Sequence, residues 1–244
     1  MHRFYADPDL SDDRRFVLTQ EDTLHAVKVL RMHAGDRAEV ISSGKRFLAE
    51  IDGTGSDRTE LHPVELLPST EPRLSVTLFQ GIPKSDKMDW IVQKATELGA
   101  VRIIPVSFSR CVVRLNTKEA QKKMERWQKI AREAGMQSGR CRIPEILLPL
   151  SVKAMQDLFP SCDRVAVPWE DCPDGGPLAF VNRYPSVSSL GIVIGPEGGI
   201  APEEIRSMTE AGGEPVTLGK RILRTETAGL AAISVFSALY GEME

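Results

Sequence analysis

The sequence has little of what marks secreted, zinc-binding or membrane proteins. Its 244 residues include only four cysteines, which are scattered, form no CxxC pair and have no histidine nearby. This pattern excludes a zinc site and a disulfide framework and is typical of reduced thiols in the cytoplasm. The longest apolar runs, such as Leu190 to Ile194, are far too short to cross a bilayer, and the N-terminal stretch MHRFYADPDL has no apolar signal-peptide core. We therefore expect a cytoplasmic protein that uses no metal and no membrane.

Several common catalytic motifs are missing as well. The sequence contains no GxGxxG, no GxSxG and no HExxH. A Walker A loop would need glycine at position 214 and Ser or Thr after Lys220, but the chain has Glu214 and Arg221 there. All four histidines lie within the first 62 residues, so the rest of the chain has none for a hydrolase triad. The chemistry of the C-terminal part must run without histidine, metal or a P-loop.

The first seventy residues predict a small β-rich module. Strands are expected over 37–42, 47–51 and 58–67, with a hairpin at residues 42–45 and an edge or a bulge at Pro63. One helix is expected over 21–31, with Leu24, Val27 and Leu30 on its apolar face. The segment 67–72 contains two prolines and predicts a linker.

After residue 72 the pattern changes to strands that alternate with helices. This predicts an α/β domain with a mostly parallel sheet covered by helices on both faces. The expected strands cover residues 74–80, 101–106, 164–167, 190–194 and 216–218, and the expected helices cover 86–98, 118–137, 202–211 and 225–240.

Positive charge is concentrated in the middle of the chain. The net charge is −3, yet residues 73–150 hold 15 Lys and Arg against 7 Asp and Glu, and the segments before and after are acidic. Because Lys and Arg make most contacts with phosphate, this stretch favours a surface that faces a polyanion. A solvated helix with charges of both signs is the open alternative.

Three loops that follow expected strands are candidates for a ligand site. Val167 is followed by Pro-Trp-Glu, Ile194 by GPEGG, and Leu218 by a loop that continues to Ala228. Ligands of open α/β sheets bind at the carboxyl ends of strands, and glycines let backbone groups approach them closely. Each loop alone is also explained as an ordinary turn, but the three together predict a binding site.

The strings IGPEGG (194–199) and LGKRILRTETA (218–228) resemble the signature of the RsmE family. Members of that family are bacterial uridine N3-methyltransferases of 16S ribosomal RNA, in the SPOUT class. Further matching strings cover almost the whole chain: VLR (29–31), Gly35-Asp36, GIPK (81–84), KATELG (94–99), Arg110, Arg126-Trp127 and QSGR (137–140).

The resemblance implies a fold and a cofactor. It implies a PUA-like β-barrel for RNA binding over 1–70 and a SPOUT α/β-knot methyltransferase domain, with a deep trefoil knot, over 73–244. S-adenosylmethionine is expected in the knot, within a homodimer whose active site lies near the subunit interface. Its expected contacts come from the loops after strands: Gly195, Glu197, Gly198, Gly199, Leu218, Gly219, Ile222 and Leu223.

Methylation at uridine N3 sets the requirements for catalytic residues. N3 becomes a nucleophile only after its proton leaves, and the resulting charge spreads over O2, N3 and O4. Arg221 or Arg224 can stabilise that anion through a fixed fork of donors. Glu226 is the nearest carboxylate in the chain that can accept the proton.

The expected macromolecular partner is 16S rRNA, alone or within the 30S small ribosomal subunit. Phosphate contacts position such a substrate without reading its sequence, and the target uridine must be unstacked. The residues expected to contact RNA are Arg3, Arg31, Lys84, Lys94, Arg110, Gln137 and Arg140, with Lys87, Arg114 and Arg142 as further members of the basic set.

Three other functions are weighed against this one. Another SPOUT-type methyltransferase, acting on transfer RNA or another ribosomal base, is the nearest alternative. A non-catalytic RNA-binding or ribosome-assembly factor has no need of the LGKRILRTETA loop. A nicotinamide enzyme is disfavoured because GxGxxG is missing.

Overall fold

A computed structural model describes residues 1–7, 9–12, 14–55, 58–173 and 175–243. The chain forms two compact units, Met1–Glu71 with Gly135–Arg142, and Pro72–Ala134 with Ile143–Glu244. The expected domains, 1–70 and 73–244, differ from these units in one respect. Residues 135–142, which include the end of the long helix α3 (Thr117–Ser138), belong to the first unit.

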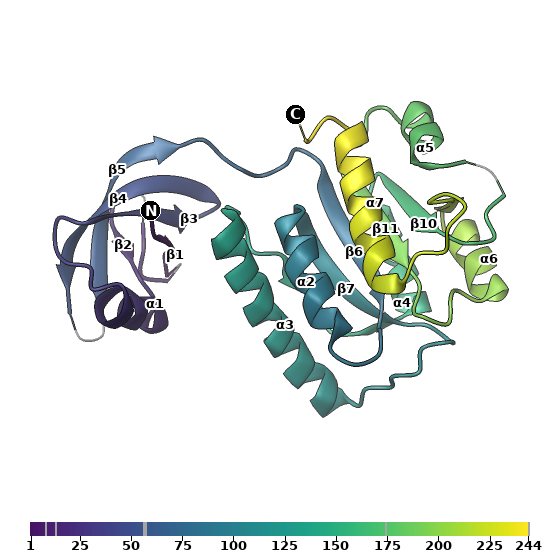
Figure 1. The fold of residues 1–244 in the computed structure, drawn as a ribbon, viewed down its shortest axis with the longest axis horizontal. Helices are drawn as coiled ribbons and strands as arrows, with labels where there is room; N and C mark the ends of the chain where they lie inside the picture. The colour runs from purple at the N-terminus through teal and green to yellow at the C-terminus, as the bar shows by residue number, and fades with distance from the viewer. Residues whose placement is uncertain (8, 13, 56–57, 174, 244) are drawn as a thin grey trace. The chain divides into compact units, whose positions relative to one another are not determined.

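The first unit is a curled sheet whose strand order is β1-β3-β4-β5-β2. An isolated antiparallel bridge between Ala6 and Leu18 joins the two outer strands, and this contact closes the sheet into a barrel (Figure 1). The barrel encloses an apolar core that includes Phe4, Phe16 and Leu61. The strands are β1 (Arg3–Tyr5), β2 (Phe16–Val17), β3 (Arg37–Ser42), β4 (Lys45–Thr54) and β5 (Thr59–Leu67).

Turn residues place the hairpin and the bulge where the sequence predicts them. Ser43 and Gly44 both have positive φ, 51° and 74°, which matches the right-handed twist of the flanking strands β3 and β4. The pairing of β4 with β5 shifts its register at Ala49, which lies opposite Pro63. The bulge therefore accommodates a residue that has no N–H to donate.

The predicted amphipathic helix of this unit is wrong at Leu24, whereas Leu30 packs against the core as expected. The structure has a short helix α1 (Gln20–Leu24) that continues into a π-helical turn η1 (His25–Val29). Asp22, Thr23 and Ala26 are the buried residues, whereas Leu24 is 36% exposed. A polar contact selects the buried face. The Thr23 hydroxyl accepts a hydrogen bond from the backbone N–H of Thr59 on β5, so Thr23 faces the sheet.

The second unit contains a seven-stranded sheet whose paired strands are all parallel. The order is β12-β10-β11-β6-β7-β8, and β9 also pairs with β7. The strands are β6 (Ser75–Gly81), β7 (Ala100–Ser107), β8 (Glu145–Ile146), β9 (Leu150–Ser151), β10 (Arg164–Pro168), β11 (Ser189–Ile194) and β12 (Gly213–Val216). The sequence did not predict β8 or β9. The strand expected over 216–218 is displaced: β12 ends at Val216, and Leu218 lies beyond it.

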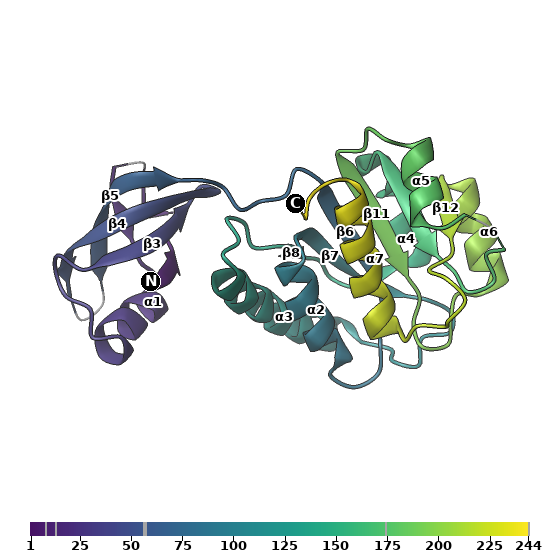
Figure 2. The same ribbon diagram turned by 45° about the horizontal axis from the view of Figure 1, so that its top comes forward.

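Helices cover both faces of this sheet, as expected (Figures 1 and 2). Besides α3, the helices are α2 (Lys87–Glu97), α4 (Val152–Gln156), the 3-10 turn η2 (Phe159–Ser161), α5 (Pro177–Arg183), α6 (Pro202–Glu210) and α7 (Thr225–Leu239). The short elements α4, η2 and α5 were not predicted.

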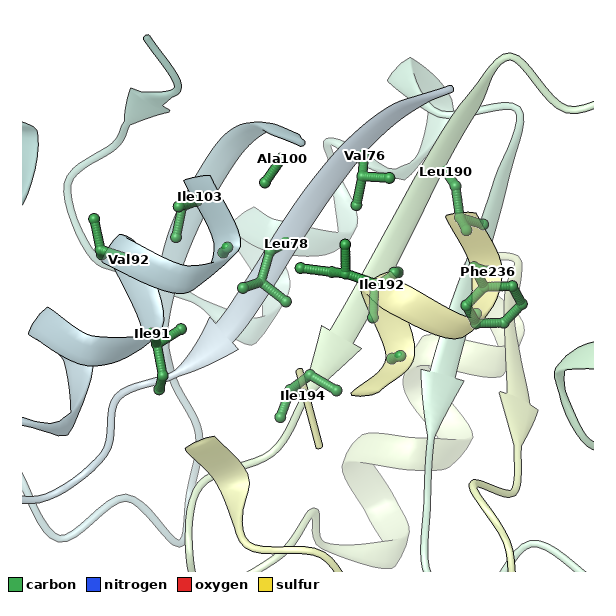
Figure 3. Close-up of a cluster of buried hydrophobic side chains, with 14 of the residues drawn as sticks. Val76, Leu78, Ile91, Val92, Ala100, Ile103, Leu190, Ile192, Ile194 and Phe236 are labelled. Atoms are coloured by element: carbon green, nitrogen blue, oxygen red, sulfur yellow. The ribbon is translucent and has the colours of Figure 1, made fainter. Parts of the chain in front are cut away.

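Alternate residues of the strands build the two cores. Leu78 and Ile192 point to the face that α2, α3, α5 and α7 cover, and they meet Ile91 of α2 and Phe236 of α7 (Figure 3). Phe79 and Val193, each next along its strand, belong to the core on the other face, with residues of α4, η2 and α6. The period of two in a parallel sheet therefore fixes which helices pack on which side.

The order in which strands are added to the sheet reverses at β6. From β6 the chain runs outward to β7, β8 and β9, and it then returns across β6 to form β10, β11 and β12 on the other side. Open α/β sheets bind ligands at such a point, outside the carboxyl ends of the strands.

Candidate active site

A cavity of about 350 Å³ lies at the carboxyl ends of β10 and β11. It is lined by the loop after β11, by the end of β10 and by the segment that leads into α7. The lining residues are Lys87, Pro168, Glu170, Ile194, Gly195, Pro196, Glu197, Gly199, Ile200, Ile222, Leu223, Arg224, Thr225 and Ala228.

A second cavity of about 420 Å³ adjoins the first. The two share Pro168, Glu170, Ile222, Leu223 and Ala228, so they lie side by side, and together they are called the hollow below. The remaining lining residues are Trp169, Cys172, Pro173, Thr217, Leu218, Gly219, Lys220 and Arg221. The three loops that the sequence singled out therefore converge on one place.

Glycine is required where β6 meets the loop after β11. A Cβ atom added to Gly81 would lie 2.5 Å from the backbone nitrogen of Pro196, a distance that real Cβ atoms do not tolerate. The absence of a side chain lets the backbones of two neighbouring strand ends touch. This contact fixes the start of the GPEGG loop against the central strand.

A chain of buried hydrogen bonds fixes α7 to the same two strands. The side-chain amide of Gln80 donates to the hydroxyl of Thr225 at 2.8 Å, and that hydroxyl donates to the carbonyl of Gly195 at 2.6 Å. Gln80 is fully buried and Thr225 is 5% exposed. The first residue of α7 is therefore held at the mouth of the cavity by polar contacts in a dry environment.

One cation stands between two carboxylates at the cavity wall. Lys87 Nζ lies 3.0 Å from Glu197 Oε1 and 3.2 Å from Glu226 Oε2. Burial opposes ionisation of Glu197, but the backbone N–H of Lys84 and the ammonium of Lys87 outweigh it, so the pKa of Glu197 lies below its ordinary value. The hydrogen bond to Glu197, together with Glu226, raises the pKa of Lys87 against the opposing effect of burial.

The structure brings together seven of the eight residues expected to contact a cofactor. Gly195, Glu197 and Gly199 line the first cavity, Leu218 and Gly219 line the second, and Ile222 and Leu223 line both. Gly198 lines neither, and its carbonyl accepts a hydrogen bond from Arg110 at 3.3 Å. Ile222 is 86% exposed and lies at the rim.

Two of the three expected catalytic residues line the cavities, and Glu226 lines neither. Arg224 lines the first part and Arg221 the second, and both are exposed. Glu226, in the first turn of α7, reaches Lys87 with its carboxylate.

The residues expected to contact RNA divide into two groups. Arg31, Lys84, Arg110 and Gln137 are exposed. Arg3 and Lys94 are partly buried and already paired, Arg3 with Glu39 at 2.8 Å and Lys94 with Glu97 at 2.7 Å.

The expectation for Arg140 is corrected by its burial. The side chain is 4% exposed and forms a bidentate ion pair with Glu71, with Nε–Oε1 and Nη2–Oε2 distances of 2.9 and 2.8 Å. Its backbone carbonyl accepts a hydrogen bond from the Tyr5 hydroxyl at 2.9 Å. The guanidinium therefore holds the first unit together and is not presented to a phosphate.

Sequence reasoning missed several lining residues. Thr225 and Thr217 were not singled out, and Lys87 was expected on an RNA surface. Thr225 had a visible signal, because it stands inside the LGKRILRTETA string at the start of a helix. Lys87 had none, since its carboxylate partners lie 110 and 139 residues away in the sequence.

Comparison with known proteins decides the family. An RNA methyltransferase domain family matches residues 70–237, and an RNA methyltransferase PUA domain matches residues 18–61. A Bacillus subtilis protein named ribosomal RNA small subunit methyltransferase E is 39% identical over 228 residues, which are 91% of this chain and 89% of that protein. The chain belongs to this methyltransferase family.

Other members agree in sequence and in structure. A Mycobacterium bovis protein of the same name is 30% identical and covers 97% of this chain and 91% of its own length. The crystal structure of the Neisseria gonorrhoeae protein of this family, bound to S-adenosyl methionine, superimposes with a TM-score of 0.86 at 33% identity and full coverage of both chains. The SPOUT-type α/β domain and the PUA-like barrel that the resemblance implied are confirmed.

The described residues form neither a membrane-spanning helix nor a metal-ligand cluster. Within residues 1–7, 9–12, 14–55, 58–173 and 175–243, no helix is long and apolar enough to span a bilayer. In the same residues, no group of three or more His, Cys, Asp or Glu is arranged to hold a metal ion.

Proposed function

We propose that this protein transfers the methyl group of S-adenosylmethionine to N3 of a specific uridine in 16S ribosomal RNA. The observation that carries the proposal is the pair of adjoining cavities formed by the three loops after β10, β11 and β12, in a chain of the methyltransferase E family. The relatives' name supplies the substrate, the small-subunit ribosomal RNA, and the site supplies the chemistry.

The residues of the hollow fit a folded S-adenosylmethionine. The combined volume of the two cavities lies in the range of small-molecule sites. Their walls mix apolar side chains with backbone from glycine-rich loops. Gly199 has a φ of 73°, a backbone conformation that favours glycine, and its missing side chain leaves room for the Glu170 carboxylate. The cofactor contacts are assigned to Gly195, Glu197, Gly199, Leu218, Gly219, Ile222 and Leu223. When bound, S-adenosylmethionine supplies an electrophilic methyl group.

Arg221 and Arg224 stabilise the uridine anion. Both are exposed at the cavity wall, and neither forms an ion pair with a carboxylate among the described residues, so their donors are available to a substrate. A guanidinium presents several N–H groups in one plane, which suits a charge delocalised over O2, N3 and O4. Stabilisation of that charge lowers the barrier because it develops in the transition state.

Glu226 accepts the proton that leaves N3. It lies in the first turn of α7, one residue after Thr225, whose hydroxyl is fixed by Gln80 and Gly195. The N3 lone pair that remains forms the new N–C bond as the methyl–sulfur bond breaks. Alignment of nucleophile and methyl group supplies the rest of the acceleration.

RNA is held by side chains from both units. The N-terminal domain, residues 1–70, acts as an RNA-binding domain through Arg31 and Arg3, and Gln137 of the same compact unit adds a contact. In the methyltransferase domain, residues 73–244, Lys84, Lys94 and Arg110 contribute, and Arg3 and Lys94 exchange their partners Glu39 and Glu97 for phosphate. These groups bind phosphates and position the strand. Assembly of small ribosomal subunits places the reaction in the cytoplasm.

The test is a methylation assay on small ribosomal subunits that lack their modifications. The protein is incubated with labelled S-adenosylmethionine, and the RNA is digested to nucleosides and analysed by mass spectrometry. The expected product is 3-methyluridine in 16S rRNA. Methylation of transfer RNA or large-subunit RNA instead would change the substrate, and failure to bind S-adenosylmethionine would refute the enzyme.

The protein also forms a homodimer in this proposal. α2 and α7 lie side by side on one face of the sheet, and together they expose Trp90 (52%), Val235 (41%) and Leu239 (36%). After Glu226, α7 has no charged residue. Exposed apolar surface of this kind marks a contact site, and a second copy of the chain covers it.

Sedimentation velocity tests the dimer. V235E introduces a charge among the exposed apolar residues of α2 and α7 and should shift the protein to monomer. V64E on β5, where Val64 is 44% exposed, should leave the dimer intact. A wild-type protein that sediments as a monomer at all concentrations would contradict this part of the proposal.

A further inference from the structure

Lys87 occupies an unusual position for a cation. It is the first residue of α2, where the unpaired N–H groups of the helix present partial positive charge and disfavour a cationic side chain. Two carboxylates offset this effect, Glu197 from the loop after β11 and Glu226 from the first turn of α7. A cation at a helix start is therefore retained by partners from two distant segments.

The Lys87 cluster, made of Lys87, Glu197 and Glu226, joins three segments at the cavity. Glu197 Oε1 accepts a hydrogen bond from Lys87 Nζ at 3.0 Å and another from the backbone N–H of Lys84 at 3.1 Å. The loop before α2 and the loop after β11 are thus connected twice. The side chains are 29%, 26% and 21% exposed, so water screens them less than it screens an ordinary surface ion pair.

We propose that Lys87 is a positioning residue of the methyltransferase site. Its ammonium ties the GPEGG loop to the first turn of α7, so that Glu197 and Thr225 are held at the wall of the same cavity. The predicted effect on turnover rests on the proposed function, whereas the effect on the geometry of the site does not. Lys87 is therefore assigned to the site and not to an RNA phosphate.

Removal of the charge gives the sharpest variant. K87M keeps the apolar stem of the side chain but removes the ammonium that lies 3.0 Å from Glu197 and 3.2 Å from Glu226. The two carboxylates then have no cation between them, and like charges repel. The GPEGG loop and the start of α7 then move apart. We expect the Kd for S-adenosylmethionine to rise and kcat to fall, each on the order of tenfold, because small displacements of positioning groups are costly.

Two further variants separate charge from shape. K87R retains the cation and should restore most of the lost affinity and turnover. The addition of E197Q to K87M removes the repulsion and should recover part of the affinity, since the two residues act as a coupled pair. K153M is the matched control, because Lys153 also pairs with a carboxylate, Asp157 at 3.7 Å, but is 83% exposed and lies on α4.

The readouts are the Kd for S-adenosylmethionine by titration calorimetry, the Tm by circular dichroism, and kcat with separate KM values for cofactor and RNA. Unchanged Kd and kcat in K87M would overturn the proposal, as would a K87R variant as impaired as K87M. A rise confined to the KM for RNA would assign Lys87 to a phosphate contact instead.

If K87M does not fold, E197Q, which removes one arm of the cluster, takes its place, and an unchanged Kd there overturns the proposal. A wild-type protein that binds cofactor without methylating 16S rRNA would refute the proposed function, while the Kd series would still test Lys87.

Discussion

The side chain of Gln80 donates a hydrogen bond to the hydroxyl of Thr225 across 145 residues of sequence, at 2.8 Å. This bond and the one from Thr225 to the Gly195 carbonyl connect the central strand, the GPEGG loop and α7. T225V keeps the shape but removes the hydroxyl, which leaves buried polar groups without their partner. We expect a loss of about 1–3 kcal/mol in the free energy of unfolding and weaker binding of S-adenosylmethionine.

Urea unfolding and cofactor titration measure both effects of T225V. T225S retains the hydroxyl and is the matched control, and it should remain close to wild type. Equal stability of the valine and serine variants would mean that these hydrogen bonds contribute nothing measurable.

A methyl group at Gly81 should disturb the site through the backbone. In G81A the new Cβ would lie 2.5 Å from the Pro196 nitrogen, so the strand end and the GPEGG loop must separate. We expect a loss of about 1–3 kcal/mol of stability and reduced cofactor affinity. The same change at Gly53 of β4, where a Cβ meets no atom within 4 Å, is the control for calorimetry and unfolding. If G81A binds cofactor as wild type does, the close approach is not needed by the site.

Arg140 should matter for stability and not for RNA affinity. R140A leaves the Glu71 carboxylate, 14% exposed, with the backbone N–H groups of Cys141 and Arg142 but without its bidentate partner, and loss of hydrogen bonds to a charged group costs about 1.5–3 kcal/mol. R142A, two residues further along and exposed, should change the free energy of unfolding much less. Chemical denaturation compares the two. A stable R140A variant with weakened RNA binding would restore the expectation that Arg140 is a phosphate contact.

Arg224 should affect turnover far more than cofactor binding. R224A removes the guanidinium that we propose stabilises the substrate anion, and loss of one such donor lowers kcat on the order of 10²- to 10³-fold. The Kd for S-adenosylmethionine should change little, because the proposed cofactor contacts lie on other residues. R206A on the exposed side of α6 is the control. A variant with full turnover would remove Arg224 from the catalytic role.

Much of the second unit could be predicted because its strands and helices carry strong periodic signals. β6, β7, β10 and β11 all lie within two residues of their expected bounds. The short elements β8, β9, α4 and α5 escaped prediction because two to seven residues carry no reliable period. The buried position expected for Leu24 in the helix over 21–31 was wrong for another reason. Hydrogen bonds of Asp22 and Thr23 select the buried face, and hydrophobic periodicity does not register them.

The site was predictable in its loops but not in its side-chain partners. GPEGG and LGKRILRTETA identify backbone that follows strands, and strand order brings them together. The environment of a charged side chain depends on distant segments. Lys87 and Arg140 belong to the same basic stretch, yet both are paired inside the molecule with carboxylates that no local pattern connects to them.

The assignment of residues 135–142 to the first unit has a consequence for how the chain is made. The N-terminal barrel lacks Arg140, the partner of Glu71, until residue 142 has been synthesised, although β5 ends at Leu67. Domains usually fold in order as they leave the ribosome. Here two closing contacts of the barrel form only after residues 72–134 of the second unit have been synthesised, and a fragment cut after Glu71 would lack both: the Arg140 guanidinium that pairs with Glu71 and the Arg140 carbonyl that accepts a hydrogen bond from the Tyr5 hydroxyl.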